Sequence, residues 1–411
     1  MTPSFPHRNF RVVHVGKFYP PHRGGMESHL AALCGALRSC LDLQVLVASD
    51  SRWSSREIVD GVPVRRLGTW LKAASTCFTP GLPAAIRDAR PDLVHLHLPN
   101  PAAVLSCFAA GFRGPLVVTY HSDVVRQRML NSLYTPCVHR LLDRCAAIVV
   151  ASPNYLASSP VLERHRDRCH VIPFGIRCEE FARFDPAAVA HERRRFGTRL
   201  VLSVGRLVYY KGFQHLVRAM AQVEGRLVLV GEGPQRRELE KLVASLGIGH
   251  RVVFAGNLSP ERLRALYHAA SVFVLPSVAR SEAFGIVQIE AMAAGRPVIN
   301  TALDSGVPFV SRHRETGFTV PPADPARLAA AINRLLEDDA LRSAYGKAAG
   351  LRAQQEFHLD LMVIRTLQVY AKVLGLTGAE GSLEMLAAAC GRPETDAGVP
   401  VTAGLEEALH P

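Results

Sequence analysis

Short apolar runs alternate along the chain with stretches whose apolar positions follow a helical period. The runs that predict β-strands in the first half lie at 10–15, 43–47, 93–97, 116–119 and 147–151. Those in the second half lie at 200–204, 226–230, 252–255, 272–275 and 297–300. Helices are predicted between them, and one helical face carries Met26, Leu30, Leu33 and Leu37. Near-continuous apolar strands joined by helices indicate parallel sheets buried on both faces, so the predicted fold class is α/β.

The pattern stops and restarts once, which predicts two domains. A chain of 411 residues is also too long for one ordinary core. We place the first domain at 1–178 and the second at 179–356, with the boundary inside the polar segment 177–199. A further helix at 359–374 follows the second domain.

The composition changes beyond residue 375. The segment 376–411 is rich in Ala, Gly and Thr and carries six acidic residues against one arginine. Such a segment has too little apolar surface to fold by itself. We therefore predict a largely disordered tail, with a short helix at 383–390.

Basic residues are concentrated in the first half of the chain. Residues 1–178 contain 21 Lys and Arg against 11 Asp and Glu, a net charge of +10, whereas residues 179–411 contain 27 against 25. The excess predicts an anionic partner for the first domain. Nucleic acid is not expected, because the basic residues are not interleaved with aromatic ones and no nucleic-acid-binding signature is present. An anionic membrane surface or a phosphate-bearing lipid fits better, and an arginine-rich solvated surface is the alternative.

Neither a membrane span nor a secretory signal is predicted. The longest apolar stretch, 101–112, is far shorter than the roughly 20 residues that cross a bilayer. The first residues include Pro3, Pro6 and Arg8 and lack the apolar core of a signal. We expect a cytoplasmic protein, with peripheral attachment to the inner membrane through its basic domain.

The segment 281–299 follows a predicted strand and opens a helix. It reads Ser-Glu-Ala-Phe-Gly-Ile-Val-Gln-Ile-Glu-Ala-Met-Ala-Ala-Gly-Arg-Pro-Val-Ile, so Glu282 precedes the helix and Glu290 lies inside it. Free backbone N–H groups at a helix start favour an anion, and here they belong to Phe284, Gly285, Ile286 and Val287. The segment can hold a diphosphate at the helix start, a sugar hydroxyl on Glu282 and a ribose on Glu290. Two surface glutamates beside a helix are the alternative that the spacing alone favours.

This segment resembles the Glu-x7-Glu motif of the retaining glycosyltransferases of family 4, inside the matching frame Glu-x-Phe-Gly … Glu-Ala-Met-Ala-x-Gly-x-Pro-Val. The resemblance covers about residues 10–374. It implies the GT-B fold, in which a first Rossmann-like domain binds the acceptor and a second binds a nucleotide-sugar donor. The final helix, 359–374, would cross back to the first domain. The resemblance also implies that Glu282 contacts hydroxyls of the donor sugar and that Glu290 contacts the nucleotide ribose.

A second matching segment lies at 203–213. It reads Ser-Val-Gly-Arg-Leu-Val-Tyr-Tyr-Lys-Gly-Phe and is similar to the family's Gly-Arg-Leu-x-x-x-Lys-Gly loop after the first strand of the donor domain. A guanidinium and an ammonium facing a diphosphate neutralise the charge that develops on the leaving group. We predict this role for Arg206 and Lys211, with Gly205 beside the donor. Outside this frame, two solvated loop charges would be the simpler interpretation.

Two features of the first domain are predicted to complete the site. Gly24 and Gly25 stand before a predicted helix, where backbone amides can approach a phosphate closely. The family has a Gly-Gly loop here that contacts donor phosphates, and a flexible turn is the alternative. His121 follows the strand at 116–119, at the edge where parallel sheets bind ligands. Family members carry a histidine here near the reacting sugar, so we predict that His121 orients or polarises that sugar, against the more general interpretation of a structural histidine.

Weaker resemblances surround the expected position of the nucleotide base. Gly231 opens a Gly-Glu-Gly-Pro sequence that begins like a dinucleotide fingerprint, but position 236 is Arg and the strand is the second of its domain. These departures argue against NAD. In family members this loop and the segment that starts at Phe254 lie near the base. Segments 305–308 and 315–318 resemble two further loops of the same site.

No metal or other cofactor is expected. The other glycosyltransferase fold chelates a metal with Asp-x-Asp at a strand end, and no such motif is present at a predicted strand end. The run Glu337-Asp338-Asp339 is most simply the polar end of a helix. Nothing suggests the pyridoxal lysine that a phosphorylase would need.

Three stretches look like those of bacterial mannosyl- and rhamnosyltransferases of O-antigen or exopolysaccharide assembly: 119–127, 151–155 and 305–311. They imply a hexosyltransferase that uses GDP-mannose or GDP-rhamnose and a lipid-linked or oligosaccharide acceptor, with polyprenyl diphosphate favoured as the carrier. A UDP-sugar donor, a sugar-nucleotide epimerase and a non-catalytic nucleotide-binding scaffold are the alternatives. An epimerase needs no separate acceptor. A scaffold would not need both glutamates, the Arg206 and Lys211 pair and His121 together.

Overall fold

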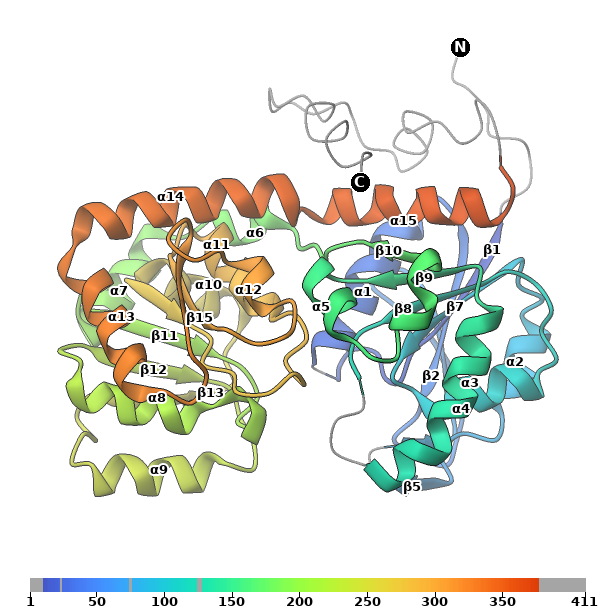
Figure 1. Cartoon of the computed structure of the whole chain (residues 1–411), viewed down its shortest axis with the longest axis horizontal. Coiled ribbons are helices and arrows are strands. Elements are labelled where there is room, and N and C mark those ends of the chain that lie inside the picture. Colours follow the sequence, from blue (N-terminus) through green and yellow to red (C-terminus); the bar gives the residue numbers. More distant parts are fainter. Residues whose placement is uncertain (1–9, 23, 74–75, 124–127, 377–411) are drawn as a thin grey trace, which may run out of the picture.

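The computed structural model describes residues 10–22, 24–73, 76–123 and 128–376. Two sheets lie side by side in an elongated molecule, and helices pack on the faces of each (Figure 1). The predicted α/β class with two Rossmann-like domains is confirmed. The predicted tail and its helix at 383–390 lie outside the described residues, which end at 376.

The first sheet has eight strands in the order β10–β9–β8–β7–β1–β2–β4–β3, and only the β3–β4 pair is antiparallel. The strands are β1 Arg11–Val15, β2 Asp42–Ala48, β3 Ser55–Val59, β4 Val62–Leu67, β7 Leu93–Leu98, β8 Leu116–Tyr120, β9 Ala147–Val150 and β10 Cys169–Val171. The five predicted strands are confirmed to within one residue at each end. The β3–β4 hairpin was not predicted, because β3 is exposed along most of its length and so has no apolar run. A separate hairpin joins β5 Leu71–Ala73 to β6 Thr76–Phe78.

The second sheet has six parallel strands in the order β13–β12–β11–β14–β15–β16. They are β11 Leu200–Val204, β12 Arg226–Val230, β13 Val252–Gly256, β14 Val272–Val274, β15 Val298–Thr301 and β16 Gly317–Val320. Five of them match the predicted runs to within one residue. The sixth, β16, was not predicted because it is a four-residue edge strand that starts at a glycine.

Helices cover both sheets and enclose four apolar clusters, two in each domain. The helices are α1 Gly25–Leu37, α2 Leu82–Asp88, α3 Pro101–Ala109, α4 Arg128–Arg144, α5 Pro153–Ser158, α6 Cys178–Ala182, α7 Pro186–Phe196, α8 Phe213–Ala219, α9 Arg236–Ser245, α10 Pro260–Ala269, α11 Ile286–Ala293, α12 Val307–Val310, α13 Pro325–Glu337, α14 Asp339–Glu356 and α15 Leu359–Val373. Short 3-10 turns span Glu163–Arg168, Tyr209–Lys211 and Met220–Gln222. None of the described helices is long and apolar enough to cross a membrane.

The chain passes between the domains twice, and the two passages lie side by side. Ile176 N–H donates to the Phe357 carbonyl at 3.0 Å, and Leu359 N–H donates to the Ile176 carbonyl at 2.8 Å. Gly175 is required here, because a Cβ at this position would lie 2.7 Å from the His358 carbonyl oxygen. Helix α14 packs on the second domain and α15 on the first (Figure 1). The predicted crossing helix is therefore confirmed.

The segment 177–199 is not the polar linker that we expected. It folds as α6 and α7, which pack against α11 and α10 of the second domain. Its buried positions, among them Cys178, Val189 and Phe196, belong to the core of that domain. The arginines between them made the segment look like a connection, although one of them, Arg193, donates to the His268 carbonyl of α10 at 3.2 Å.

Candidate active site

The carboxyl ends of the parallel strands of both sheets carry the predicted site residues. His121 follows β8 of the first sheet, Gly24 lies between β1 and α1, and Gly25 is the first residue of α1. In the second sheet Gly205 and Arg206 follow β11, Gly231 follows β12, and Glu282 lies between β14 and α11. Ligands of α/β folds bind at this edge, so the topology brings the two halves of the predicted site together.

Lys211 and Glu282 form the most enclosed ion pair of this region. Lys211 Nζ lies 2.5 Å from Glu282 Oε2, and both residues are 8% exposed. Ser277 Oγ donates to the same carboxylate oxygen at 3.0 Å. The lysine stem passes over Gly205, whose φ of 154° suits glycine and where a Cβ would lie 3.2 Å from Lys211 Cε. Sequence matching proposed these residues separately, and the fold makes them partners.

The start of α11 is shaped to accept an anion. Gly285 caps the helix in the left-handed conformation, with φ 77°, and a Cβ there would lie 2.6 Å from Leu275. The first amides of a helix have no acceptor within it, so those of this turn are available to a phosphate. Phe284 is buried and packs edge-on against Phe174 and Phe357. Its ring anchors the loop, whereas Ile286 and Val287 remain partly exposed at the helix start.

Glu290 faces a cavity between the domains. Tyr267 Oη donates to Glu290 Oε2 at 2.6 Å. Burial raises the pKa of Glu290 above its ordinary value, and the tyrosine hydroxyl and the Lys211 charge act in the opposite direction. The cavity has a volume of about 170 Å³ and is lined from both domains by Ser28, His29, Ala32, Gly175, Ile176, Arg177, Glu180, Phe181, Ile286, Glu290 and Leu359.

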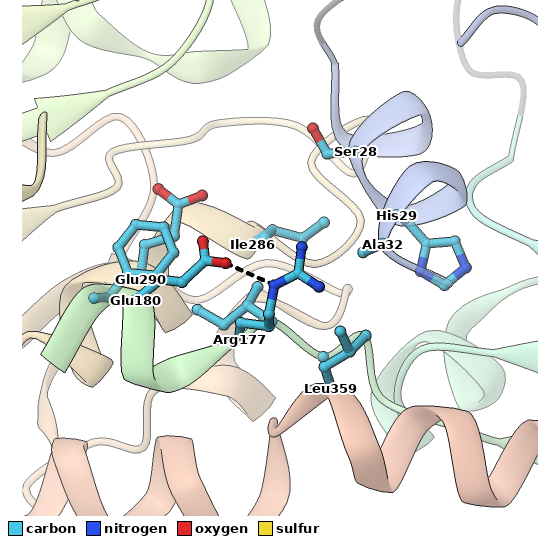
Figure 2. A pocket seen from close by; sticks show the side chains of 11 residues that line it. Ser28, His29, Ala32, Arg177, Glu180, Ile286, Glu290 and Leu359 are labelled. Atoms are coloured by element: carbon cyan, nitrogen blue, oxygen red, sulfur yellow. Dashed lines mark hydrogen bonds and ion pairs between the residues drawn. The ribbon is translucent and has the colours of Figure 1, made fainter. Parts of the chain in front are cut away.

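Figure 2 shows Arg177 within this cavity, joined to Glu180, with Ser28 and His29 of α1 on the other side. The Arg177 Nε donates to Glu180 Oε1 at 2.6 Å. Helix α1 starts directly after Gly24, so the predicted Gly24–Gly25 loop lies one turn before the residues that line the cavity. None of Arg177, Glu180 and His29 was predicted. His29 could have been noticed as a polar residue on the apolar face of its helix.

His121 is buried at the end of a chain of polar side chains. Its Nε2 lies 3.1 Å from His97 Nδ1, and His97 Nε2 lies 3.1 Å from His14 Nδ1. His14 Nε2 lies 3.2 Å from Tyr370 Oη of α15, which lies 2.5 Å from His95 Nδ1. The far end of the chain is a 2.7 Å contact between His95 Nε2 and Thr119 Oγ1. Burial lowers the pKa of each of the four histidines far below its ordinary value, so all are neutral.

A neutral imidazole donates from one nitrogen and accepts at the other. The bonds that join His14, His97 and His121 must therefore all point the same way, and their direction depends on whether the Tyr370 hydroxyl donates to His14 or accepts from it. If Tyr370 donates to His14, His121 carries its proton on Nδ1, and if Tyr370 accepts, His121 carries it on Nε2. The tautomer of His121 is thus coupled to Tyr370 on the crossing helix. No His-x-His pair was expected in the sequence, and this expectation was wrong, because His95 and His97 form one.

His29 stands beside this chain without joining it. Its ring lies 5.1 Å from that of His121 and 4.2 Å from that of Phe174. Neither of its nitrogens has a hydrogen-bond partner among the described residues. The ring nitrogens of His29, His97 and His121 lie within 4.8 Å of one another, as do those of His14, His95 and His97. Both triplets are close enough to hold a metal ion, and the chain of hydrogen bonds already engages four of the five rings.

The remaining predicted residues lie around the mouth of the second domain. Arg206 is exposed at the end of β11, near Tyr210. Gly231 has a φ of 124°, and a Cβ there would lie 2.2 Å from the Gly205 carbonyl oxygen, so this close backbone approach requires glycine at position 231. Phe254 is partly buried in β13, and the Arg236 guanidinium lies 5.7 Å from its ring.

One ion pair joins the two halves of the site directly. Arg280 Nη2 lies 3.1 Å from Asp123 Oδ2 and 3.2 Å from Ser158 Oγ. Asp123 comes two residues after His121, and Arg280 comes two residues before Glu282. The aspartate is also held by Tyr120 Oη at 2.9 Å and Ser159 Oγ at 2.8 Å. This bridge was not predicted, because contacts between domains leave no periodic signal in the sequence.

Comparison with known proteins agrees with this geometry. Residues 24–175 match the family described as "Glycosyl transferase 4-like domain", and residues 189–352 match "Glycosyl transferases group 1". D-rhamnosyltransferase WbpZ of Pseudomonas aeruginosa is 36% identical over 351 residues, which are 84% of this chain and 92% of the relative. O-antigen chain mannosyltransferase C of Escherichia coli is 32% identical over 368 residues, which are 89% and 99% of the two chains.

Solved structures share the arrangement of both domains. Sucrose-phosphate synthase from Thermosynechococcus elongatus superposes with a TM-score of 0.77 at 26% identity, over 90% of this chain and all of the other. Anabaena HepE in complex with UDP-glucose has a TM-score of 0.74 at 22% identity, over 90% of this chain and all of the other. Two facing sheets, a crossing helix and the matched loops at the strand ends agree with both family descriptions, so the chain belongs to the family 4 glycosyltransferases and is an enzyme with the GT-B fold.

Proposed function

We propose that this enzyme transfers a hexose, mannose or rhamnose, from a GDP-linked donor to a sugar acceptor carried on polyprenyl diphosphate, in the assembly of a bacterial polysaccharide or lipopolysaccharide. The observation that carries the proposal is the Lys211–Glu282 pair, which lies just before α8 and α11. It puts a cation and a carboxylate where a diphosphate and its sugar would meet. The printed names of the rhamnosyl- and mannosyltransferase relatives support the choice of hexose. A 30% identical mycobacterial relative is described as GDP-mannose-dependent, which supports the choice of nucleotide.

In this proposal the diphosphate lies against the first amides of α11. Lys211 and Arg206 neutralise the charge that grows on the departing nucleoside diphosphate, which is the largest electrostatic demand of the reaction. Glu282 accepts hydrogen bonds from hydroxyl groups of the donor sugar, and Glu290 accepts hydrogen bonds from those of the ribose. His121 holds the transferred sugar from the first domain, and the Gly24–Gly25 loop approaches the donor phosphates. No divalent metal or other cofactor takes part.

The proposed transfer retains the anomeric configuration. The bond between the anomeric carbon and the phosphate oxygen breaks as the acceptor oxygen attacks the same face, and the departing phosphate oxygen takes the acceptor proton. Glu282 is bonded to Lys211 and Ser277, which leaves it poorly placed to act as a nucleophile. That engagement supports same-face attack over a covalent intermediate.

Nucleotide release from purified protein tests the donor. The protein is incubated with GDP-mannose, GDP-rhamnose, UDP-glucose and ADP-glucose together with a short-chain polyprenyl-diphosphate sugar. We expect GDP release with mannose or rhamnose, and the anomeric proton coupling of the product should report retention. Release of UDP alone would refute the GDP donor and favour the UDP-sugar alternative. Interconversion of the donor sugar without transfer would favour an epimerase.

We further propose that the basic first domain meets an anionic membrane surface on the cytoplasmic side, where a lipid-linked acceptor would lie. The excess of basic over acidic residues in 1–178 supports this. Several arginines of this domain, however, already have structural partners. Arg144 and Arg168 donate to backbone carbonyls, and Arg164 pairs with Asp143. These three arginines therefore do not choose the docking surface.

A further inference from the structure

Both tryptophans of the chain stand out in solvent. Trp53 is 82% exposed and Trp70 is 67% exposed. Two more large apolar side chains next to Trp70 along the β5–β6 hairpin are also exposed, Leu71 at 62% and Phe78 at 58%. Large apolar side chains that gather on a surface mark an interaction site more often than scattered ones do.

The backbone places the segments that carry these four residues side by side, and we call the four residues the aromatic patch. Thr69 N–H donates to the Ser51 carbonyl at 2.8 Å, and Gly68 N–H donates to Ser54 Oγ at 2.9 Å. The segment that carries Trp53 therefore runs beside the one that leads to Trp70. Trp70 N–H donates to the Phe78 carbonyl at 3.0 Å, and Leu71 and Phe78 are directly paired across β5 and β6. Directly paired residues share one face of a hairpin, so both present their side chains on the same side.

The patch lies at the carboxyl-end edge of the first sheet. This edge also carries the active-site residues of the first domain. Trp53 comes after the carboxyl end of β2 and Trp70 after that of β4, and these strands run parallel to β1 and β8. Asp50 links the two regions, because it pairs with Lys72 at 3.0 Å and with His22 of the loop before α1 at 2.7 Å. In Figure 1, β5 lies on the side of the molecule opposite to α14 and α15.

Basic residues neighbour the patch along the chain. Arg52 and Arg56 are exposed, and no ion pair to either is found among the described residues. Lys72, which is also exposed, shares Asp50 with His22. Two acidic side chains also lie nearby along the chain: Glu57 of β3 is held by Arg66, and Asp60 is exposed directly after β3. The combination of exposed indole rings, apolar neighbours and unpaired guanidinium groups is chemically suited to the headgroup region of an anionic bilayer, where tryptophan is enriched.

We propose that the aromatic patch inserts into the surface of an anionic lipid bilayer and thereby turns the acceptor side of the cleft toward the membrane. The proposed function enters here only as the reason for membrane binding, which is delivery of a lipid-linked acceptor. The test of membrane binding does not measure catalysis. Since each basic residue near anionic lipid strengthens binding about fivefold, Arg52, Arg56 and Lys72 would add to the affinity and make it depend on salt.

Intrinsic fluorescence tests the proposal on the unmodified full chain, because the patch holds its only tryptophans. Vesicles of phosphatidylglycerol and phosphatidylcholine should shift the emission to shorter wavelength, and lipids brominated near the headgroup should quench it. Pure phosphatidylcholine vesicles should have little effect. Sedimentation with anionic vesicles that leaves the tryptophan emission unchanged would show that another surface docks, and it would overturn the proposal.

Substitutions separate lipid binding from folding. Trp53→Ser with Trp70→Ser should weaken vesicle sedimentation at least tenfold, and Arg52→Glu with Arg56→Glu should weaken it at low salt but much less at high salt. Leu351→Ser is the matched control, because Leu351 is 62% exposed on α14 of the second domain. Melting temperatures should be similar throughout, since every substituted side chain is exposed. Equal loss in the control, or wild-type sedimentation of the tryptophan variant, would refute the assignment.

A second copy of the chain is the rival occupant of the patch. A dimer in analytical ultracentrifugation that Trp70→Ser dissociates, together with no binding to vesicles, would overturn the lipid assignment. GDP release with a water-soluble acceptor is measured in parallel on the same variants. Unchanged release with lost vesicle binding supports the proposal, whereas absent release in the wild type would count against the proposed donor only.

Discussion

Lys211 Nζ and Glu282 Oε2 lie 2.5 Å apart, and both side chains are buried. The two residues belong to different loops of the donor domain. Without a donor the two charges satisfy each other. A nucleotide diphosphate brings its own negative charge and must share the lysine. The pair therefore holds both loops in position for a ligand that competes for one member of it.

Removing either member should impair activity more than stability can explain. Lys211→Met and Glu282→Gln should each lower turnover at least ~100-fold, or about 2.7 kcal/mol of transition-state stabilisation. Each should also lower the melting temperature, because it leaves a buried charge without its partner. The double variant should regain much of the stability but none of the activity. Glu261→Ala, at an exposed position of α10, is the control. Activity within a few-fold of wild type in both single variants would refute the assignment.

Tyr370 should influence His121 from the crossing helix. Tyr370→Phe removes the hydroxyl between His14 and His95 and leaves one nitrogen of each ring unpaired, at a cost of about 1–3 kcal/mol for each buried group. With the chain interrupted, His14, His97 and His121 are no longer coupled to His95. Nitrogen NMR of the imidazoles should report a changed or mixed tautomer at His121, with a lower kcat and a nearly unchanged KM for the donor.

The matched control for this experiment is Tyr345→Phe, because Tyr345 packs against the core of the second domain and is not a member of the hydrogen-bonded histidine chain. It should leave the imidazole spectrum as in the wild type. A Tyr370→Phe variant that is destabilised but keeps both the His121 tautomer and kcat would show that the chain has only a structural role.

Stability should fall steeply in mild acid. Burial lowers the pKa of His14 and of His29 to about 3, and that of His95, His97 and His121 also lies well below the ordinary value of 6.5. Below pH 6.5 the unfolded chain binds protons that the folded chain does not. Each histidine then removes up to about 1.4 kcal/mol of unfolding free energy per pH unit, down to its folded pKa. Urea titrations between pH 5 and pH 8 should show the loss below pH 6.5 and a plateau above it.

His29 distinguishes a structural from a functional histidine. Its unpaired nitrogens are buried beside Phe174, so His29→Phe should stabilise the protein. It should also remove the contribution of one histidine to the loss of unfolding free energy below pH 6.5. If the ring contacts a substrate in the cavity, activity should fall at least tenfold in the same variant. Higher stability with full activity would confine His29 to the core.

The Asp123–Arg280 ion pair should stabilise the arrangement in which the two halves of the site face each other. Arg280→Ala should lower kcat/KM about five- to tenfold, the value of a partly exposed ion pair of about 1 kcal/mol, with little change in melting temperature. Arg264→Ala is the control, since its ion pair with Glu261 lies within one helix. Small-angle scattering should show a larger radius of gyration for Arg280→Ala alone. Equal kinetic effects in both variants would remove the bridge from the mechanism.

Activity should not need a divalent metal. Dialysed enzyme should keep its rate in excess EDTA, because the proposed leaving-group stabilisation comes from Lys211, Arg206 and helix amides. Loss of activity that magnesium restores would reveal a missing phosphate-bound ion. Restoration by zinc alone would instead point to the histidine triplets at His29, His97 and His121.

The pattern of neighbouring residues in the sequence was enough to predict the strands and the main motifs of this protein. The ten buried strands appear as apolar runs because a parallel sheet is covered on both faces, and each run was placed to within one residue. The glutamates of the 281–299 segment and the loop with Arg206 and Lys211 were found as continuous motifs. Such motifs are visible because a strand end and a helix start are neighbours in sequence as well as in space.

Other features were decided only by the tertiary structure. The pairing of Lys211 with Glu282, the bridge from Asp123 to Arg280 and the chain from Tyr370 to His121 join residues that are 71, 157 and 249 positions apart. Sequence periodicity reports which face of an element is buried, and it carries no information about which element lies opposite. Those partners are set by strand order and by the return of α15 to the first domain. The sequence thus determined the fold and the chemical groups of the site, and packing determined which of those groups act on one another.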